Sequence, residues 1–191
     1  MNLANTAVQL GQADPETLCI AAHIIALPGG DLDEGIAIVN RALAENPNSA
    51  DALAIGGMLH AYSGDTRMAM RLLEEANRLT PRGVRINFWD FGYYLTGFVD
   101  ADYERVLDGT AQALREQPTN VTALRYRTAA LALLGRLDEA RRTVARLLAV
   151  NSDMTISRCR RHIEVEMKNP FKRPGVVEAY YDGLRLAGLP E

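Results

Sequence analysis

Three histidines and two cysteines are the side chains best suited to chemistry in this sequence. His23, His60 and His162 lie far apart along the chain, so none has a second histidine at the short spacing of a metal site on one helix. Cys19 and Cys159 are 140 positions apart, and neither belongs to a CxxC pair. We therefore expect packed histidines, two reduced thiols and no bound metal.

Carboxylate pairs and glycine motifs do not suggest catalysis either. The adjacent Glu74 and Glu75 would point in different directions from one helix, so they would not form an acid–base pair. The sequence contains no GxxxxGKS/T or GxGxxG motif for a nucleotide, and no HExxH or GxSxG motif for hydrolysis. The chain is predicted to have no catalytic residues, to bind no cofactor and to be no enzyme.

The composition is that of a soluble globular protein. The 191 residues can bury a core, and 48% hydrophobic with 24% charged residues excludes disordered and fibrous classes. Apolar stretches such as 19–27 are shorter than the roughly 20 residues that cross a bilayer. Residues 1–12 lack the basic and apolar segments of a secretory signal. We expect a cytoplasmic protein that binds no membrane.

Basic residues are concentrated in the segment 125–173. Residues 1–120 carry 8 basic and 16 acidic side chains, whereas residues 121–175 carry 12 basic and 5 acidic ones. Arg158, Arg160 and Arg161 form the densest group, which could bind a polyanion such as nucleic acid. Aromatic residues that would stack on bases are scarce there. Solvated helix faces are the favoured interpretation, and nucleic-acid binding remains a minor alternative.

A repeated pattern of helical segments organises the chain. The segments 33–47, 66–81, 102–118 and 137–152 resemble one another, and their last residues are 34, 37 and 34 positions apart. Small or apolar residues recur at matching positions on one helical face, where they let a second helix approach closely. An apolar stretch with helical spacing precedes each segment, with a turn marked by Gly30, Gly64, Asp100 or Gly135. The pattern predicts an all-α, antiparallel helix-pair solenoid.

These residues resemble the tetratricopeptide repeat (TPR) family. The second copy carries the match, with Gly57, Gly64, Ala69, Ala76 and Pro81 at typical positions of the 34-residue unit. The resemblance implies a right-handed superhelix of four helix pairs, at about 15–48, 49–82, 83–119 and 120–152. The third copy departs from the pattern through three extra residues, which we place around 97–101.

The C-terminal part has a narrower resemblance. The run from Gly135 to Leu148 and the ending from Gly183 to Glu191 look like the C-terminal repeat region of bacterial class III adenylate or guanylate cyclase-like proteins. In those proteins a catalytic or DNA-binding domain precedes the repeats. This resemblance implies a regulatory or scaffolding region of a larger signalling protein. Residues 1–14 would then be the tail of a preceding repeat or an N-terminal helix.

The two ends of the predicted array differ in how they are covered. Residues 153–191 are expected to form a basic helix and a C-terminal capping helix, whose apolar stripe includes Val177, Tyr181 and Leu184. At the other end only the short segment 3–10 covers the repeats. We therefore expect the N-terminal end to be the site of any homo-oligomer or contact with another domain.

The predicted concave wall is the candidate binding surface, because the first helices of stacked repeats line it. Projection by repeat position places these residues on it: Ile20, Ile24, Ala54, Met58, Tyr62, Phe88, Tyr93 and Arg125. We predict a protein–protein interaction module whose partner is a protein, a peptide or another domain of the same polypeptide. The alternatives are a freestanding peptide-binding adaptor and nucleic-acid binding through the segment 125–173.

Overall fold

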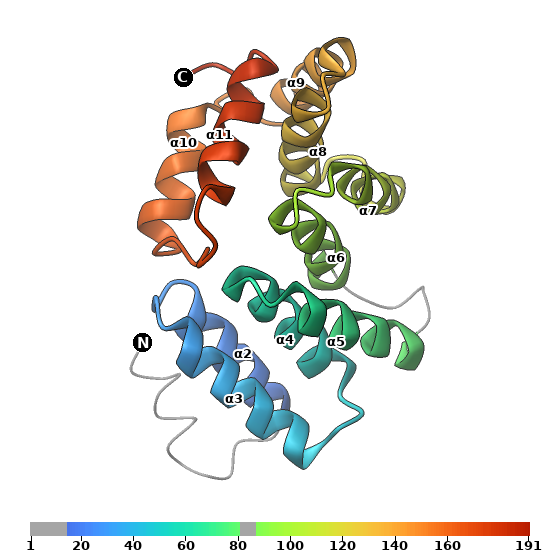
Figure 1. Ribbon diagram of the computed structural model, residues 1–191, viewed down its shortest axis with the longest axis vertical. Coiled ribbons are helices and arrows are strands. Elements are labelled where there is room, and N and C mark those ends of the chain that lie inside the picture. Colours follow the sequence, from blue (N-terminus) through green and yellow to red (C-terminus); the bar gives the residue numbers. More distant parts are fainter. Residues whose placement is uncertain (1–14, 81–86) are drawn as a thin grey trace.

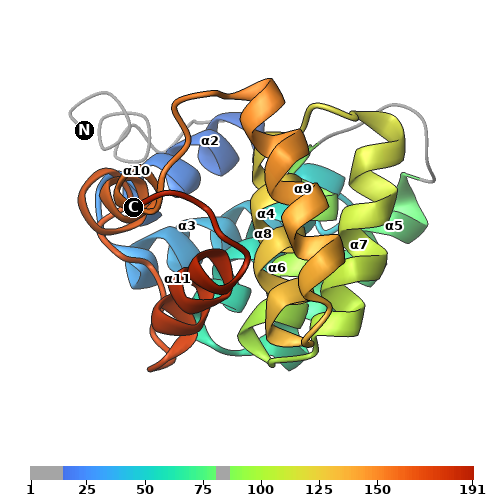
Figure 2. The same cartoon turned by 90° about the horizontal axis from the view of Figure 1, so that it is seen from above.

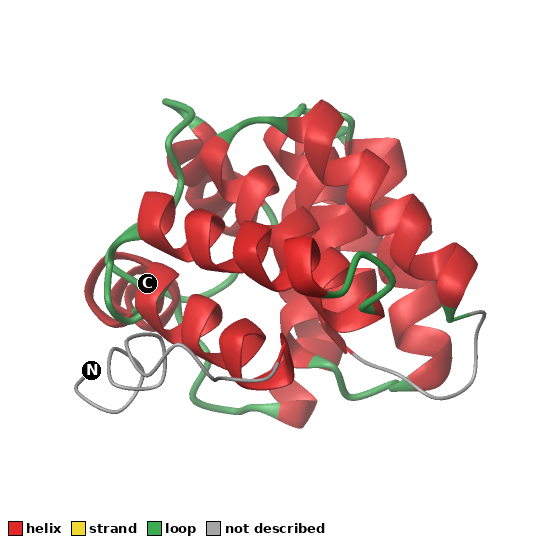
Figure 3. Cartoon of the chain, turned by 90° about the horizontal axis from the view of Figure 1, so that it is seen from below, coloured by secondary structure: helices red, strands yellow, loops and turns green. Residues whose placement is uncertain are grey.

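The regular elements of this protein are helices. The computed structural model describes residues 15–80 and 87–191, and the side chains of 16–80 and 90–191. Within these ranges there is no strand (Figures 1 and 3). The helix pairs are α2 (Pro15–Ala26) with α3 (Leu32–Glu45), α4 (Ala50–Ser63) with α5 (Thr66–Leu79), α6 (Asn87–Val99) with α7 (Tyr103–Glu116), and α8 (Val121–Leu133) with α9 (Leu137–Val150). The predicted all-α solenoid of antiparallel helix pairs is confirmed.

Short polar residues begin most of these helices. The side chains of Asp31, Ser49, Asp65, Asp102 and Asn120 each accept a hydrogen bond from the backbone N–H three residues later. Such caps satisfy N–H groups that have no partner inside the helix. The sequence therefore fixes where each helix starts through local hydrogen bonds, before any packing between helices.

The turn inside the third pair differs from the expected one. Gly64 ends α4 in the left-handed conformation, with φ of 88°, as glycine readily does. In the third pair this conformation belongs to Ala101, with φ of 58°, and not to Asp100. The first helix of the third pair, α6, therefore ends one residue later than the sequence pattern indicated.

The three extra residues of the third copy lie before its first helix, so their expected place at 97–101 was wrong. Seven residues, 80–86, separate the described ends of α5 and α6, and 81–86 lie outside the described residues. The corresponding connections, 46–49 and 117–120, span four residues each. A longer connection between pairs leaves both helices of the third pair at normal length, whereas an insertion inside the pair would disturb their packing.

Small residues bring the two helices of a pair close together. A Cβ at Gly35 would lie 2.5 Å from the Cβ of Ala26, and one at Gly57 would lie 2.6 Å from Leu73 Cγ. Neither distance leaves room for a methyl group. The small residues recognised from the repeat pattern therefore set the distance between helices within the first two pairs.

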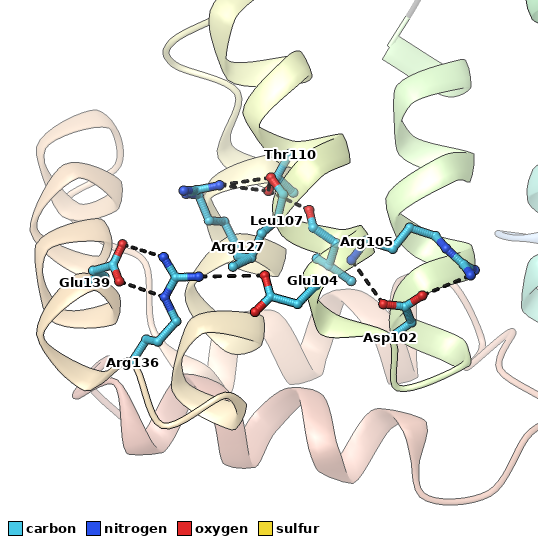
Figure 4. Close-up of polar contacts among 9 residues, drawn as sticks. Asp102, Glu104, Arg105, Leu107, Thr110, Arg127, Arg136 and Glu139 are labelled. Carbon is cyan, nitrogen blue, oxygen red and sulfur yellow. Dashed lines mark hydrogen bonds and ion pairs between the residues drawn. The ribbon is translucent and has the colours of Figure 1, made fainter.

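Polar contacts join the third and fourth pairs (Figure 4). Arg136, just before α9, forms two hydrogen bonds of 2.7 and 2.9 Å to the Glu139 carboxylate and an ion pair of 3.7 Å to Glu104 on α7. Arg127 of α8 donates a hydrogen bond of 3.0 Å to the Leu107 carbonyl oxygen of α7. Both arginines thus connect the last pair to α7.

The C-terminal region turns back along the inner side of the array. It contains α10 (Ile156–Arg160), the π-helical turn η1 (Arg161–Glu166) and α11 (Val176–Leu186). Figure 1 shows α10 near the C-terminus and η1 leading from it toward the turn between α2 and α3, and Figure 2 shows the same region from above. The Lys172 N–H donates to the Tyr62 carbonyl oxygen at 3.0 Å, and Arg173 donates to the Val99 carbonyl oxygen at 2.7 Å. The C-terminal region therefore contacts the second and third helix pairs, from which it is distant in sequence.

Helix α11 covers the first helix of the last pair. Its Gly183 lies so close to α8 that an added Cβ would be 2.7 Å from the Ala129 carbonyl oxygen. Val177, Tyr180 and Leu184 of α11 are buried. The predicted capping helix, α11, thus packs mainly on α8, which is one of the helices of the inner wall. None of the helices in the described ranges is long and apolar enough to span a membrane.

Candidate functional site

A pocket of ≈ 720 Å³ lies on the inner side of the array. The first helices of all four pairs contribute to it, and the returning C-terminal region forms another part of its wall. Its principal lining residues are His23 of α2 and Leu27 just after it, Met58 and Tyr62 of α4, Phe91 and Tyr94 of α6, Thr122, Arg125 and Tyr126 of α8, and His162, Ile163, Phe171 and Tyr180 of the C-terminal region. This volume is within the range of small-molecule and cofactor sites.

Arg125 is a buried cation in this pocket, only 8% exposed. Its Nη1 lies 3.8 Å from the Cys159 Sγ and its Nη2 lies 3.4 Å from the Thr122 Oγ1, and both are weak, uncharged acceptors. Its Nε has no hydrogen-bond partner. Among the described residues, no carboxylate lies within 4.0 Å of this guanidinium. A buried charge without a counter-ion is costly, which makes Arg125 the unusual group of the site.

Aromatic rings surround Arg125, and they supply no negative charge. The rings in the pocket wall are Tyr62, Phe91, Tyr94, Tyr126, Phe171 and Tyr180. Phe171 of the C-terminal region packs edge-on against Tyr62, with ring centroids 4.9 Å apart. Burial raises the pKa of the tyrosine hydroxyls above the usual range, so they remain neutral at physiological pH. The Tyr180 hydroxyl is buried beside the Cys159 thiol, whose sulfur is only a weak hydrogen-bond acceptor.

Two histidines line the pocket from different parts of the chain. Burial lowers the pKa of His23 on α2, which favours its neutral form. His162 on η1 lies with its Nδ1 3.0 Å from the Glu166 Oε2, and the hydrogen bond from His162 lowers the pKa of that carboxyl. Glu166 is the acidic residue of the pocket lining, and it is exposed and paired with His162. The Glu166 carboxylate is therefore paired with His162 and not with Arg125.

Only some of the residues predicted for the concave wall line the pocket. Met58, Tyr62 and Arg125 line the pocket. Ile20 is 57% exposed and Ile24 is half-buried, and neither lines the pocket.

Two of the other three residues lie away from the pocket. Ala54 is buried in a small cluster with Leu72 and Ala76, and Tyr93 is half-buried beside Gly109 of α7. The Phe88 side chain lies outside the described side chains. The projection by repeat position and the pocket involve the same four helices, whereas the packing of each helix decided which faces are turned to the pocket.

The three arginines of the predicted basic patch are each balanced by an acid. Arg158 lies 3.6 Å from Asp153, Arg160 lies 3.7 Å from Glu164, and Arg161 lies 3.5 Å from Glu166. The Arg160 guanidinium also lies over the Tyr181 ring, 4.8 Å from its centroid. These exposed pairs reduce the excess positive charge that phosphate binding would use.

Most of the pocket lining comes from residues that the sequence did not assign to it. Phe91 and Tyr94 carry a sequence signal, because they belong to an aromatic cluster at 89–94. His162, Phe171 and Tyr180 carry none, because nothing in the repeat pattern indicates that the C-terminal region returns to the inner wall. In the part of the chain that the structure describes, no group of three or more His, Cys, Asp or Glu side chains is placed to hold a metal ion.

Comparisons with known proteins identify the fold. No family model and no curated protein sequence matches the chain. YrrB, described as a TPR protein with an unusual peptide-binding site, is similar in structure with a TM-score of 0.55 and 16% identity, over 96% of this chain and 95% of YrrB. A tetratricopeptide repeat protein from Parabacteroides merdae is similar with a TM-score of 0.64 and 15% identity, over 95% of this chain and 74% of that one. The chain therefore has the fold of tetratricopeptide repeat proteins.

Proposed function

We propose that this protein is a non-catalytic protein-interaction module that binds a short segment of a partner protein in the inner pocket. One observation carries the proposal: the first helices of all four pairs and the C-terminal region together form one pocket of ≈ 720 Å³. Its aromatic walls supply apolar contact area, and its polar rim at residues 117–122 can hydrogen-bond a peptide backbone. A segment with one or two apolar side chains fits such a site better than a whole helix.

The similarity to YrrB supports this proposal, because that protein has the same fold and is described as having a peptide-binding site. The chemistry of the pocket supports it as well. The pocket contains no pair of carboxylates and no nucleophile with an adjacent base, which are the usual groups of a hydrolytic site. The cyclase-like parent has support from the sequence resemblance alone.

A display selection with random peptides on the full chain tests the proposal. Gln117 lies on the pocket rim and Gln112 lies on the same helix–loop region away from it, so the two offer a matched pair of substitutions. We expect selected peptides to bind the wild type and Gln112→Trp equally, and to bind Gln117→Trp at least tenfold more weakly. Equal binding to both variants would place the peptides elsewhere and contradict the proposal.

The partner segment could also belong to another domain of the same polypeptide, as the resemblance to cyclase-like proteins implies. An immunoblot of source cells with an antibody against this chain tests that reading. A band several times heavier than 21.0 kDa supports a regulatory region of a larger protein. A band at this mass supports a freestanding adaptor.

A further inference from the structure

We infer that the inner pocket binds an organic carboxylate, with the carboxylate against Arg125 and an aromatic or branched apolar body against the surrounding rings. The inference names the ligand chemistry of the site in the proposed function and rests on the same pocket. It starts from the buried Nε of Arg125, which has no hydrogen-bond partner, and from the buried hydroxyl of Tyr180, whose neighbour is the Cys159 thiol, a weak acceptor; Arg125 and Tyr180 line one cavity.

The electrostatics of the pocket favour one negative charge. Arg125 is held by weak neutral acceptors, and the four tyrosines near it remain neutral. An anion that enters the pocket would pair with a guanidinium that has already lost most of its water. The pocket also includes the first turn of α8, where the helix dipole favours an anion.

The number and arrangement of hydrogen-bond donors in the site favour a carboxylate over a phosphate. A planar carboxylate can accept two parallel hydrogen bonds from one guanidinium, and Tyr180 offers a further donor in the same cavity. A phosphate carries up to two charges and calls for more donors than one arginine and one hydroxyl supply. The rings of Tyr62, Phe91 and Phe171 would cover an apolar body attached to the carboxylate.

Calorimetric titration of the full chain with indole-3-propionate tests the inference. Its amide is the matched probe without charge, and Arg125→Met and Arg146→Met are matched variants, since Arg146 is exposed on α9. We expect the acid to bind, and the amide and the Arg125→Met variant to show at least tenfold weaker binding, which equals about 1.4 kcal/mol. Arg146→Met should bind as the wild type does.

Several outcomes would overturn the inference. They are equal binding of acid and amide, unchanged binding by a folded Arg125→Met variant, tighter binding of phenyl phosphate than of the acid, and no binding of any carboxylate probe by the folded wild type. Arg125→Lys keeps the charge without the planar fork. Partial retention by this variant would support the role of the charge, whereas complete retention of affinity would contradict a two-bond contact.

Two further probes separate the possible sources of the carboxylate. Acetyl-Phe-Phe with a free C-terminus and the same peptide with an amidated C-terminus differ only in the terminal charge. Binding of the free-ended peptide alone identifies a chain end as ligand and supports the proposed function too. Binding of indole-3-propionate with neither peptide supports a small-molecule ligand and contradicts the proposed peptide site. The two proposals can therefore fail separately.

Discussion

Arg125 is the residue whose environment least resembles that of an ordinary core residue. It lies in the second turn of α8, among buried residues that are mostly apolar or small, including Leu124 and Ala129. A leucine or methionine would pack there without a buried charge. A cation kept at such a position lowers stability, and this is the pattern found where a buried charge serves binding.

We expect Arg125→Met to stabilise the protein. Methionine can fill the space of the arginine stem and removes the charge that lacks a counter-ion, so the free energy of unfolding should rise by about 1 to 3 kcal/mol. Urea unfolding of wild type and variant measures this change. Arg67→Met, at an exposed position on α5, is the control and should remain within about 0.5 kcal/mol of the wild type. A decrease at Arg125 would show that its contacts already compensate its burial.

His23 gives the protein a predicted sensitivity to acid. Burial lowers its pKa in the folded state, whereas in the unfolded chain it takes up a proton near pH 6.5. The unfolded state therefore binds more protons on acidification, and the contribution of His23 to stability, complete above about pH 6.5, is lost as the pH falls toward the lowered pKa. We expect the free energy of unfolding to decrease between about pH 7 and pH 5.

Urea unfolding at several pH values measures this effect in the wild type and in His23→Gln. The slope can reach at most about 1.4 kcal/mol per pH unit for each such histidine. His60 contributes in the same direction, because burial lowers its pKa despite the opposing effect of Asp65. The slope should therefore decrease in His23→Gln and decrease further in the double variant with His60→Gln. An identical slope in all three proteins would refute the role of these histidines.

At the scale of elements, close helix contacts depend on single glycines. α11 reaches α8 through Gly183, where a Cβ would lie 2.7 Å from a backbone oxygen and 2.9 Å from the Cα of Ala129. Backbone atoms cannot move aside as the end of a flexible side chain can. A methyl group at this position must therefore separate the two helices and open the wall of the pocket.

We expect Gly183→Ala to lower the free energy of unfolding by about 1 to 3 kcal/mol. Helix propensity alone would change it in the opposite direction, by about 1 kcal/mol in favour of alanine. The sign of the change, measured by thermal or urea unfolding, therefore decides between the two effects. Glu178→Ala, on an exposed position of α11, is the control and should have little effect.

At the scale of the whole molecule, the C-terminal region adds contacts to helix pairs that lie far from it in sequence. Arg173 contacts Val99 and Asp100 in the third pair, and the Lys172 backbone binds Tyr62 in the second pair. In an open solenoid each repeat contacts only its neighbours. The returning region adds contacts of long sequence separation, so we expect the full chain to unfold in one cooperative transition.

Deletion of residues 174–191 tests the contribution of this region. The deletion removes seven buried apolar or aromatic side chains and uncovers α8. We expect a lower thermal midpoint or an insoluble protein, because the exposed face of α8 is apolar. An unchanged midpoint would show that α11 is not needed to close the structure.

Coincident unfolding curves would establish cooperativity. Far-ultraviolet circular dichroism reports all helices, whereas the fluorescence of Trp89 reports α6. We expect the two signals to change together in the full chain and to separate in a variant without residues 153–191. Separate transitions in the full chain would contradict a single cooperative unit.

The sequence by itself determined the helix pairs, because the information that forms them is local. Asp31, Ser49, Asp65 and Asn120 start helices through hydrogen bonds within three residues, and Gly35 and Gly57 set close contacts at fixed positions of the repeat. These features recur at the period of the repeat, so they can be recognised in the sequence. The length of the third copy was also visible, although not the position of its extra residues.

The pocket was decided by the tertiary structure alone. Arg125 and Tyr62 are 63 positions apart, and Phe171 and His162 reach them only because the C-terminal region turns back along the inner wall. That turn depends on side-chain packing and on single hydrogen bonds between distant segments, such as the one from Arg173 to Val99. Contacts of this kind leave no periodic trace in a sequence, because each forms once and between residues that no repeat relates.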